Sequence, residues 1–139
     1  MATFHKSITL STKGNCDLID VTGKVEDIVR ESSFEAGICT LFCPGSTASI
    51  TTIEYEDGLL KDFPDAMERL VPQDIIYKHH LRWGDGNGHS HVRASILGPS
   101  LTIPFVNSSL TLGTWQQVVC CDFDNKPRDR RIEVMIIGE

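Results

Sequence analysis

Runs of β-branched and apolar residues recur along the whole chain without a helix between each of them, and this spacing restricts the folds available to it. A sheet of parallel βαβ units would need a helix in nearly every connection. Strand patterns occupy residues 5–12, 37–43, 48–53, 100–106, 110–112, 116–122 and 131–137, and helical patterns occupy residues 23–33, 57–70 and 91–97. The pattern predicts an α+β fold with a mixed, largely antiparallel sheet and two or three helices.

The size and charge of the chain restrict its domain count and its partners. With 139 residues and 40% hydrophobic residues, it is predicted to form a single domain over residues 1–139. A formal net charge of -6 disfavours binding to nucleic acids and to anionic membranes, because both are polyanions. No segment has the length and apolar character of a membrane span or a signal peptide, so we expect a cytoplasmic protein.

Four of the five histidines fall between residues 79 and 91. Imidazoles are common ligands of zinc and other transition metals. On an extended segment, His89 and His91 would project to the same side, and the glycine-rich run 83–88 can reverse the chain so that His79 returns toward them. The cluster predicts a metal site formed by His79, His89 and His91 with an exchangeable water. The alternative is a polar surface loop.

Polar side chains also flank the strand pattern at residues 48–53. Ser46 and Thr47 lie in a turn whose backbone amides could face a phosphate or carboxylate, although such hydroxyls commonly bond their own backbone. Glu54 and Asp57 follow at the other end of the strand pattern. Carboxylates at that position either cap the next helix or serve as a general base or magnesium ligand.

Two further segments are candidates for ligand contact. Trp115 and Gln116 lie where a turn meets a strand, and they could offer an aromatic wall and an amide to a heterocycle. The alternative is ordinary packing of the tryptophan. The basic run 125–131 predicts a solvated hairpin, or arginines that clamp a phosphate.

The order of these motifs resembles the YjbQ family over essentially the whole chain. The shared features are a Pro-x-x-Thr-Ala turn, an acidic strand end, a Tyr-x-His, a histidine loop leading into a helix, and Leu-Gly-Thr-Trp-Gln. The family consists of small bacterial and archaeal proteins often described as secondary thiamine-phosphate synthase enzymes. The resemblance implies an α+β fold that assembles as a homotrimer, with a polar cleft whose histidines can hold a metal.

The resemblance also implies roles for single residues. The matching positions are His79 and His91, Glu54 and Asp57, Ser46 and Thr47, and Trp115 with Gln116. Many relatives carry a histidine where this chain has Gly45, so one ligand or acid–base group is missing, and His89 is the candidate to replace it.

Three functions follow as expectations. The first, implied by the family, couples a thiazole phosphate to a pyrimidine methyl diphosphate, with Arg93 or a divalent metal neutralising the diphosphate. Zinc suits the histidines, and magnesium suits diphosphate chemistry. The second is a metal-assisted hydrolase of a phosphoester or amide, with Glu54 as general base and the attacking water on a metal held by His79, His89 and His91. The third is a non-catalytic trimer that binds a metal or a small phosphorylated or anionic metabolite.

Overall fold

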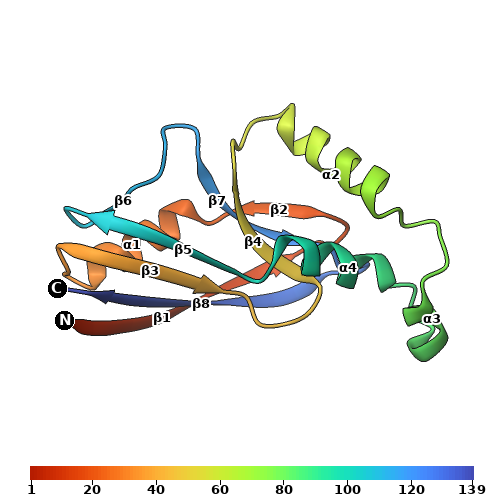
Figure 1. Ribbon diagram of the computed structural model, residues 1–139, viewed down its shortest axis with the longest axis horizontal. Helices are drawn as coiled ribbons and strands as arrows, with labels where there is room; N and C mark the ends of the chain where they lie inside the picture. The colour runs from red at the N-terminus through yellow and green to blue at the C-terminus, as the bar shows by residue number, and fades with distance from the viewer.

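The computed structural model describes residues 1–139 and contains two antiparallel sheets and four helices. Figure 1 shows their arrangement. The strands are β1 (Ala2–Thr12), β2 (Asp17–Asp20), β3 (Ala36–Phe42), β4 (Ala48–Ile53), β5 (Ser100–Val106), β6 (Ser109–Leu110), β7 (Gln117–Asp122) and β8 (Arg128–Gly138). The helices are α1 (Thr22–Glu31), α2 (Leu59–Leu70), α3 (Lys78–Trp83) and α4 (Gly88–Leu97). The predicted α+β class is confirmed.

The larger sheet has the strand order β1-β8-β3-β5-β6, and every neighbouring pair is antiparallel. The two longest strands, β1 and β8, pair along their whole length, from Ala2 with Gly138 to Thr12 with Arg128. Alternate residues of β8, such as Ile132, Val134 and Ile136, are fully buried. This period of two is the signal from which the strand was predicted, because successive side chains of a strand point to opposite faces.

The smaller sheet has the order β2-β7-β4 and is buried on both faces. One face of β7 presents Val118 and Cys120 to the main core, which also contains α1 and the inner face of the larger sheet. The other face presents Val119 and Cys121 to a second cluster that includes residues of α2 and α4. A central strand that is covered on both faces has a continuous run of apolar residues in the sequence, and residues 118–121 of β7 form such a run.

The number of helices exceeds the expected two or three because α3 has only six residues. A segment this short spans fewer than two turns and shows no helical periodicity in the sequence. Helix α4 begins at Gly88, where a side chain would be impossible: a Cβ would lie 2.4 Å from Cβ of Tyr77. No helix combines the length and apolar character needed to cross a membrane.

Candidate functional site

The helices α3 and α4 bring two of the four clustered histidines together. The ring centroids of His79 and His91 are 4.3 Å apart, and the rings are inclined by 37°. Asp85, in the connection between the helices, places Oδ1 3.4 Å from Nδ1 of His79, an electrostatic contact without hydrogen-bond geometry. The nitrogen Nδ1 of His79 is enclosed and has no hydrogen-bond partner. This His79–His91 pair is the densest arrangement of acid–base groups among the predicted site residues.

The surroundings of His91 favour its neutral form. Burial lowers the pKa of His91, and the neighbouring His79 lowers it further, while Asp85 and Asp124 act in the opposite direction. The charged form of an imidazole loses hydration when it is buried, and a second imidazole adds repulsion once it is protonated. At neutral pH, His91 is therefore available as a proton acceptor.

His89 does not join this pair, contrary to the three-histidine site predicted from the sequence. The segment is helical rather than extended, so residues two apart differ by about 200° around the axis, at about 100° per residue. His89 is 1% exposed and faces Tyr77, with ring centroids 6.5 Å apart. Burial lowers the pKa of His89, and the Arg93 charge adds to the effect. His89 is thus a neutral core histidine.

The chain does not present the metal site that the sequence suggested. No group of three or more histidine, cysteine, aspartate or glutamate side chains is arranged to hold a metal ion. His79 and His91 lie together beside Asp85, but His89 is buried against Tyr77 and does not join them. The donor set of a single chain therefore does not fit a zinc centre of three protein ligands.

Arg93 forms its hydrogen bonds within the protein. It is buried, and its Nε and Nη2 donate to the carbonyl oxygen of Val71 at 3.0 and 2.8 Å. Its Nη2 also donates to Oε2 of Glu68 at 2.8 Å. The guanidinium thus ties the end of α2 to α4, which makes it a structural clasp rather than an open anion-binding group.

A buried polar network lies beneath the turn that contains Ser46 and Thr47. Thr47 Oγ1 donates to Oδ2 of Asp124 at 2.9 Å and accepts a hydrogen bond from Nη2 of Arg130. Arg130 also binds both carboxylate oxygens of Asp122, at 2.7 and 3.0 Å. The hydroxyl of Thr47 is therefore occupied inside the protein, and only that of Ser46 faces outward.

The same network fixes the start of α4. Asn87 Nδ2 donates to Oδ2 of Asp124 at 3.2 Å, and Asn87 Oδ1 accepts from Ser90 Oγ and from the backbone N–H of Asn125. Burial alone would raise the pKa of Asp124, but hydrogen bonds from Thr47, Asn87 and Arg128 outweigh it and hold the pKa below its usual range. Through Asp124, the turn before β4 and the helix that carries His91 share one anchor.

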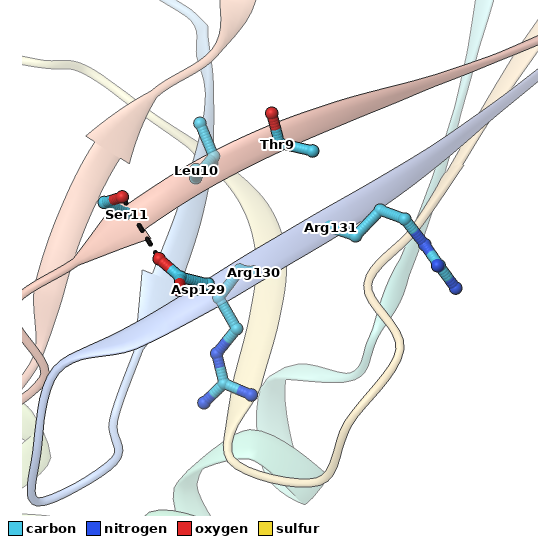
Figure 2. Close-up of a pocket in the computed structure, with 6 residues that line it drawn as sticks. All are labelled: Thr9, Leu10, Ser11, Asp129, Arg130 and Arg131. Carbon is cyan, nitrogen blue, oxygen red and sulfur yellow. Dashed lines mark hydrogen bonds between the residues drawn. The ribbon is translucent and has the colours of Figure 1, made fainter.

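Sequence reasoning missed Asp122, Asp124 and Asn87, and it named Arg130 only as one of the arginines of the basic run 125–131. A signal was present: Asp122 ends an apolar strand, and a carboxylate there is rarely buried without a charged partner. Figure 2 shows Arg130 and Arg131 pointing to different sides of β8. Both line a surface cavity of about 380 Å³ with residues of β1, but only Arg130 reaches the buried network.

The remaining predicted residues lie at the opposite end of β4. Glu54 lines two adjoining surface cavities of about 400 and 310 Å³, and Trp115 stands in the wall of both. Trp115 is 73% exposed, and Gln116 donates to Oγ1 of Thr52 at 3.0 Å. Asp57 is exposed, and the carboxylate that caps α2 belongs to Glu56, which accepts from the backbone N–H groups of residues 58 and 59.

The structure therefore divides the predicted site into two groups. Ser46, Thr47, His79 and His91 lie around one end of β4, and Glu54, Trp115 and Gln116 lie at the other. Figure 1 shows α3 and α4 near the first end and the connection to α2 at the second. Six strand residues separate the ends, or about 20 Å at roughly 3.3 Å per residue. Within one chain, Glu54 is too distant to be the general base for the His79–His91 pair.

Comparison with known proteins agrees with this architecture. A family model described as UPF0047 protein YjbQ-like matches residues 6–139. The chain belongs to the YjbQ-like UPF0047 family. A UPF0047 protein of Methanothermobacter thermautotrophicus is 37% identical over 139 residues, which cover 100% of this chain and 95% of the relative. The protein YugU of Bacillus subtilis is 31% identical over 134 residues, covering 96% and 98%.

A solved structure extends the similarity to three dimensions. The crystal structure of a YbjQ-like protein from Sulfolobus solfataricus, described as of unknown function, has a TM-score of 0.94. It is 34% identical to this chain, and the alignment covers 99% of both. None of these three names states a reaction. The family and fold expected from the resemblance are confirmed, whereas the thiamine-phosphate synthase activity rests on the resemblance alone.

Proposed function

We propose that this YjbQ-like protein is an acid–base hydrolase of a small anionic metabolite, with His79 and His91 as its catalytic pair. The observation that carries the proposal is the approach of the two rings to 4.3 Å beside Asp85. Two titratable groups in different environments can hold different protonation states, as an acid and a base require.

The roles follow from the surroundings of each ring. His91, whose pKa is lowered by burial and by His79, accepts a proton from the attacking water. His79, which faces the Asp85 carboxylate, donates a proton to the leaving oxygen or nitrogen. The water oxygen bonds to the phosphorus or carbonyl carbon as the bond to the leaving group breaks. His91 gains one proton and His79 loses one. The pair returns to its starting state when His91 releases its proton to solvent and His79 takes one up.

The alternative functions draw less support from the geometry. The diphosphate of a thiamine-phosphate synthase substrate would have to be neutralised without Arg93, which is buried and bonded through Nε and Nη2 to Val71 and Glu68. A metal-assisted hydrolase would need a donor set that a single chain does not contain. A binding protein without turnover would use the same pair, and only an activity measurement separates it from an enzyme.

The test is turnover of small chromogenic phosphate esters and amides by the wild-type protein and by His79→Ala and His91→Ala variants. His5→Ala is the matched control, because His5 is exposed on β1 and pairs only with Glu133. We expect hydrolysis that is lost in both variants and kept in the control. No hydrolysis of either substrate class, or equal rates in all four proteins, would contradict the proposal.

The pH profile gives an independent readout. A catalytic base must be unprotonated, and the pKa of His91 lies below the ordinary histidine value of 6.5. We therefore expect the midpoint of the acid limb of the kcat/KM profile to lie at a pH below 6.5. A limb well above that value would assign the base to another group.

A further inference from the structure

The turn between β3 and β4 contains a set of hydrogen-bond donors that the protein leaves unused. The backbone N–H groups of Gly45, Ser46 and Thr47 donate to no protein acceptor, and neither does the hydroxyl of Ser46. Gly45 has a φ of +112°, a conformation that glycine adopts readily and other residues rarely do. Successive free amides at such a turn are the backbone geometry that binds oxyanions in many proteins.

Arg130 supplies a charged donor to the same place. Its side chain is 9% exposed and is held in position through Nε and Nη2 by Asp122 and Thr47. Its Nη1 has no acceptor, and a Cβ added at residue 45 would lie 3.0 Å from it. The glycine therefore leaves open the space in front of this guanidinium nitrogen. A guanidinium already fixed by other bonds loses little entropy when it binds an anion.

The turn also lies against the helix that carries His91. A cavity of about 130 Å³ is lined by Gly45, Ser46 and Ala48 on one side and by Ala94 and Ser95 of α4 on the other. His91 precedes these helix residues by three and four positions, so it lies on the same face, about 5–6 Å away along the helix. A ligand in the turn is thus adjacent to the His79–His91 pair.

We propose that the Gly45–Thr47 turn and Nη1 of Arg130 form a phosphate subsite, so that the metabolite acted on is phosphorylated. We name this set the anion subsite; it rests on the proposed function only for the identity of the substrate. Asp122 and Asp124 balance the charges of Arg128 and Arg130, so the subsite binds mainly through directed N–H and O–H donors rather than through net positive charge. Phosphate, with several acceptor oxygens, suits such a set better than a carboxylate does.

The experiment titrates the intact protein with inorganic phosphate and follows binding by calorimetry. Ser46→Asp places a carboxylate in the exposed turn, and Ser109→Asp places the same charge in the distant exposed β5–β6 hairpin. We expect saturable binding by the wild-type protein, a loss of at least about tenfold in Ser46→Asp, which corresponds to one charge-assisted hydrogen bond, and no loss in Ser109→Asp. Gly45→Ala should also weaken binding, because its Cβ would crowd Nη1.

The outcomes separate this proposal from the proposed hydrolase. Phosphate affinity unchanged in Ser46→Asp, or no saturable binding by the wild-type protein, would overturn the anion subsite. Hydrolysis of amides but not of phosphate esters would also overturn it while leaving the His79–His91 mechanism intact. Phosphate binding that depends on Ser46, in a protein without turnover, would support the anion subsite and remove the hydrolase.

Discussion

The two ends of β4 differ in how their polar groups are held. At the histidine end, the buried Asp122 and Asp124 and the largely enclosed Arg130 form one network, which fixes the turn at Thr47 and the start of α4. At the tryptophan end, Glu54 and Trp115 are exposed beside open cavities. Preorganised donors favour chemistry, because they need no rearrangement when a ligand binds. This difference is why the proposed hydrolysis is placed at the first end.

The largest expected effect distinguishes the two ends by activity. Loss of a general acid or base typically costs about 10²–10⁴-fold in rate, so we expect His91→Ala to reduce kcat on this scale. Glu54→Gln should change kcat by less than about twofold, because Glu54 lies at the far end of β4. Steady-state kinetics on the same ester provide the measurement. A comparable loss in Glu54→Gln would mean that the two ends act together.

Stability should differ between the ends as well. Asp122→Ala removes a fully buried carboxylate that accepts from Thr12 and Arg130, and it leaves the guanidinium without its bidentate carboxylate partner. Breaking a buried pair in this way costs about 3–5 kcal/mol of unfolding free energy. Asp129→Ala, which removes an exposed carboxylate on the neighbouring segment β8, is the matched control. Urea denaturation measures both, and equal midpoints would show that the network does not hold this end together.

Acid should destabilise the histidine end first. The pKa of His89 is lowered by burial and then by Arg93, while Glu68 and Asp124 oppose the shift and His80 adds to it. Below about pH 6.5 the unfolded chain binds the proton more readily than the folded protein does, so stability falls as the pH decreases through the folded-state pKa. The melting temperature should therefore drop between pH 7.5 and 5.5, and less so in His89→Phe. Equal slopes for both proteins would assign the acid sensitivity elsewhere.

A chelator should leave the proposed activity unchanged. No three histidine, cysteine, aspartate or glutamate side chains are arranged to hold a metal ion, and the proposed roles of His79 and His91 need only protons. Dialysis against EDTA followed by an assay in metal-free buffer is the test, with a zinc-restored sample as the control. Activity lost on chelation and restored by zinc would revive the metal-assisted alternative, with ligands from outside a single chain.

The smallest effect is expected at Trp115. A side chain that is 73% exposed contributes little to the core, so Trp115→Ala should change stability by no more than about 0.5 kcal/mol. The same variant should keep the phosphate affinity of the wild-type protein. A weaker phosphate affinity would show that the tryptophan end takes part in binding.

The fold was largely predictable because its signals are local. Burial alternates along β8 because successive side chains of a strand point to opposite faces. Strand β7 is a continuous apolar run because both of its faces are covered. The site was predictable only in part, because it depends on side-chain direction. Residues 89–91 were expected to be extended, but they are helical. His89 therefore points into the core, and the predicted metal site lacks its third ligand. The distance between Glu54 and the histidines depends on tertiary structure, which motif order does not reveal.

Some expectations concern properties beyond one chain. The homotrimer implied by the family resemblance stays a prediction, and a light-scattering mass of three times 15.4 kDa would support it. The cytoplasmic location also stays a prediction.

The pairing of β4 with β7 has a mechanical consequence. Residues Ala48 to Ile53 are matched one to one with Asp122 to Gln117, and β7 is also bonded to β2 on its other side. Such a strip cannot shorten or fold without breaking several backbone hydrogen bonds at once. Hinge motion within the chain is therefore unable to close one end onto the other, and a molecule that contacts both must itself span the length of the strand.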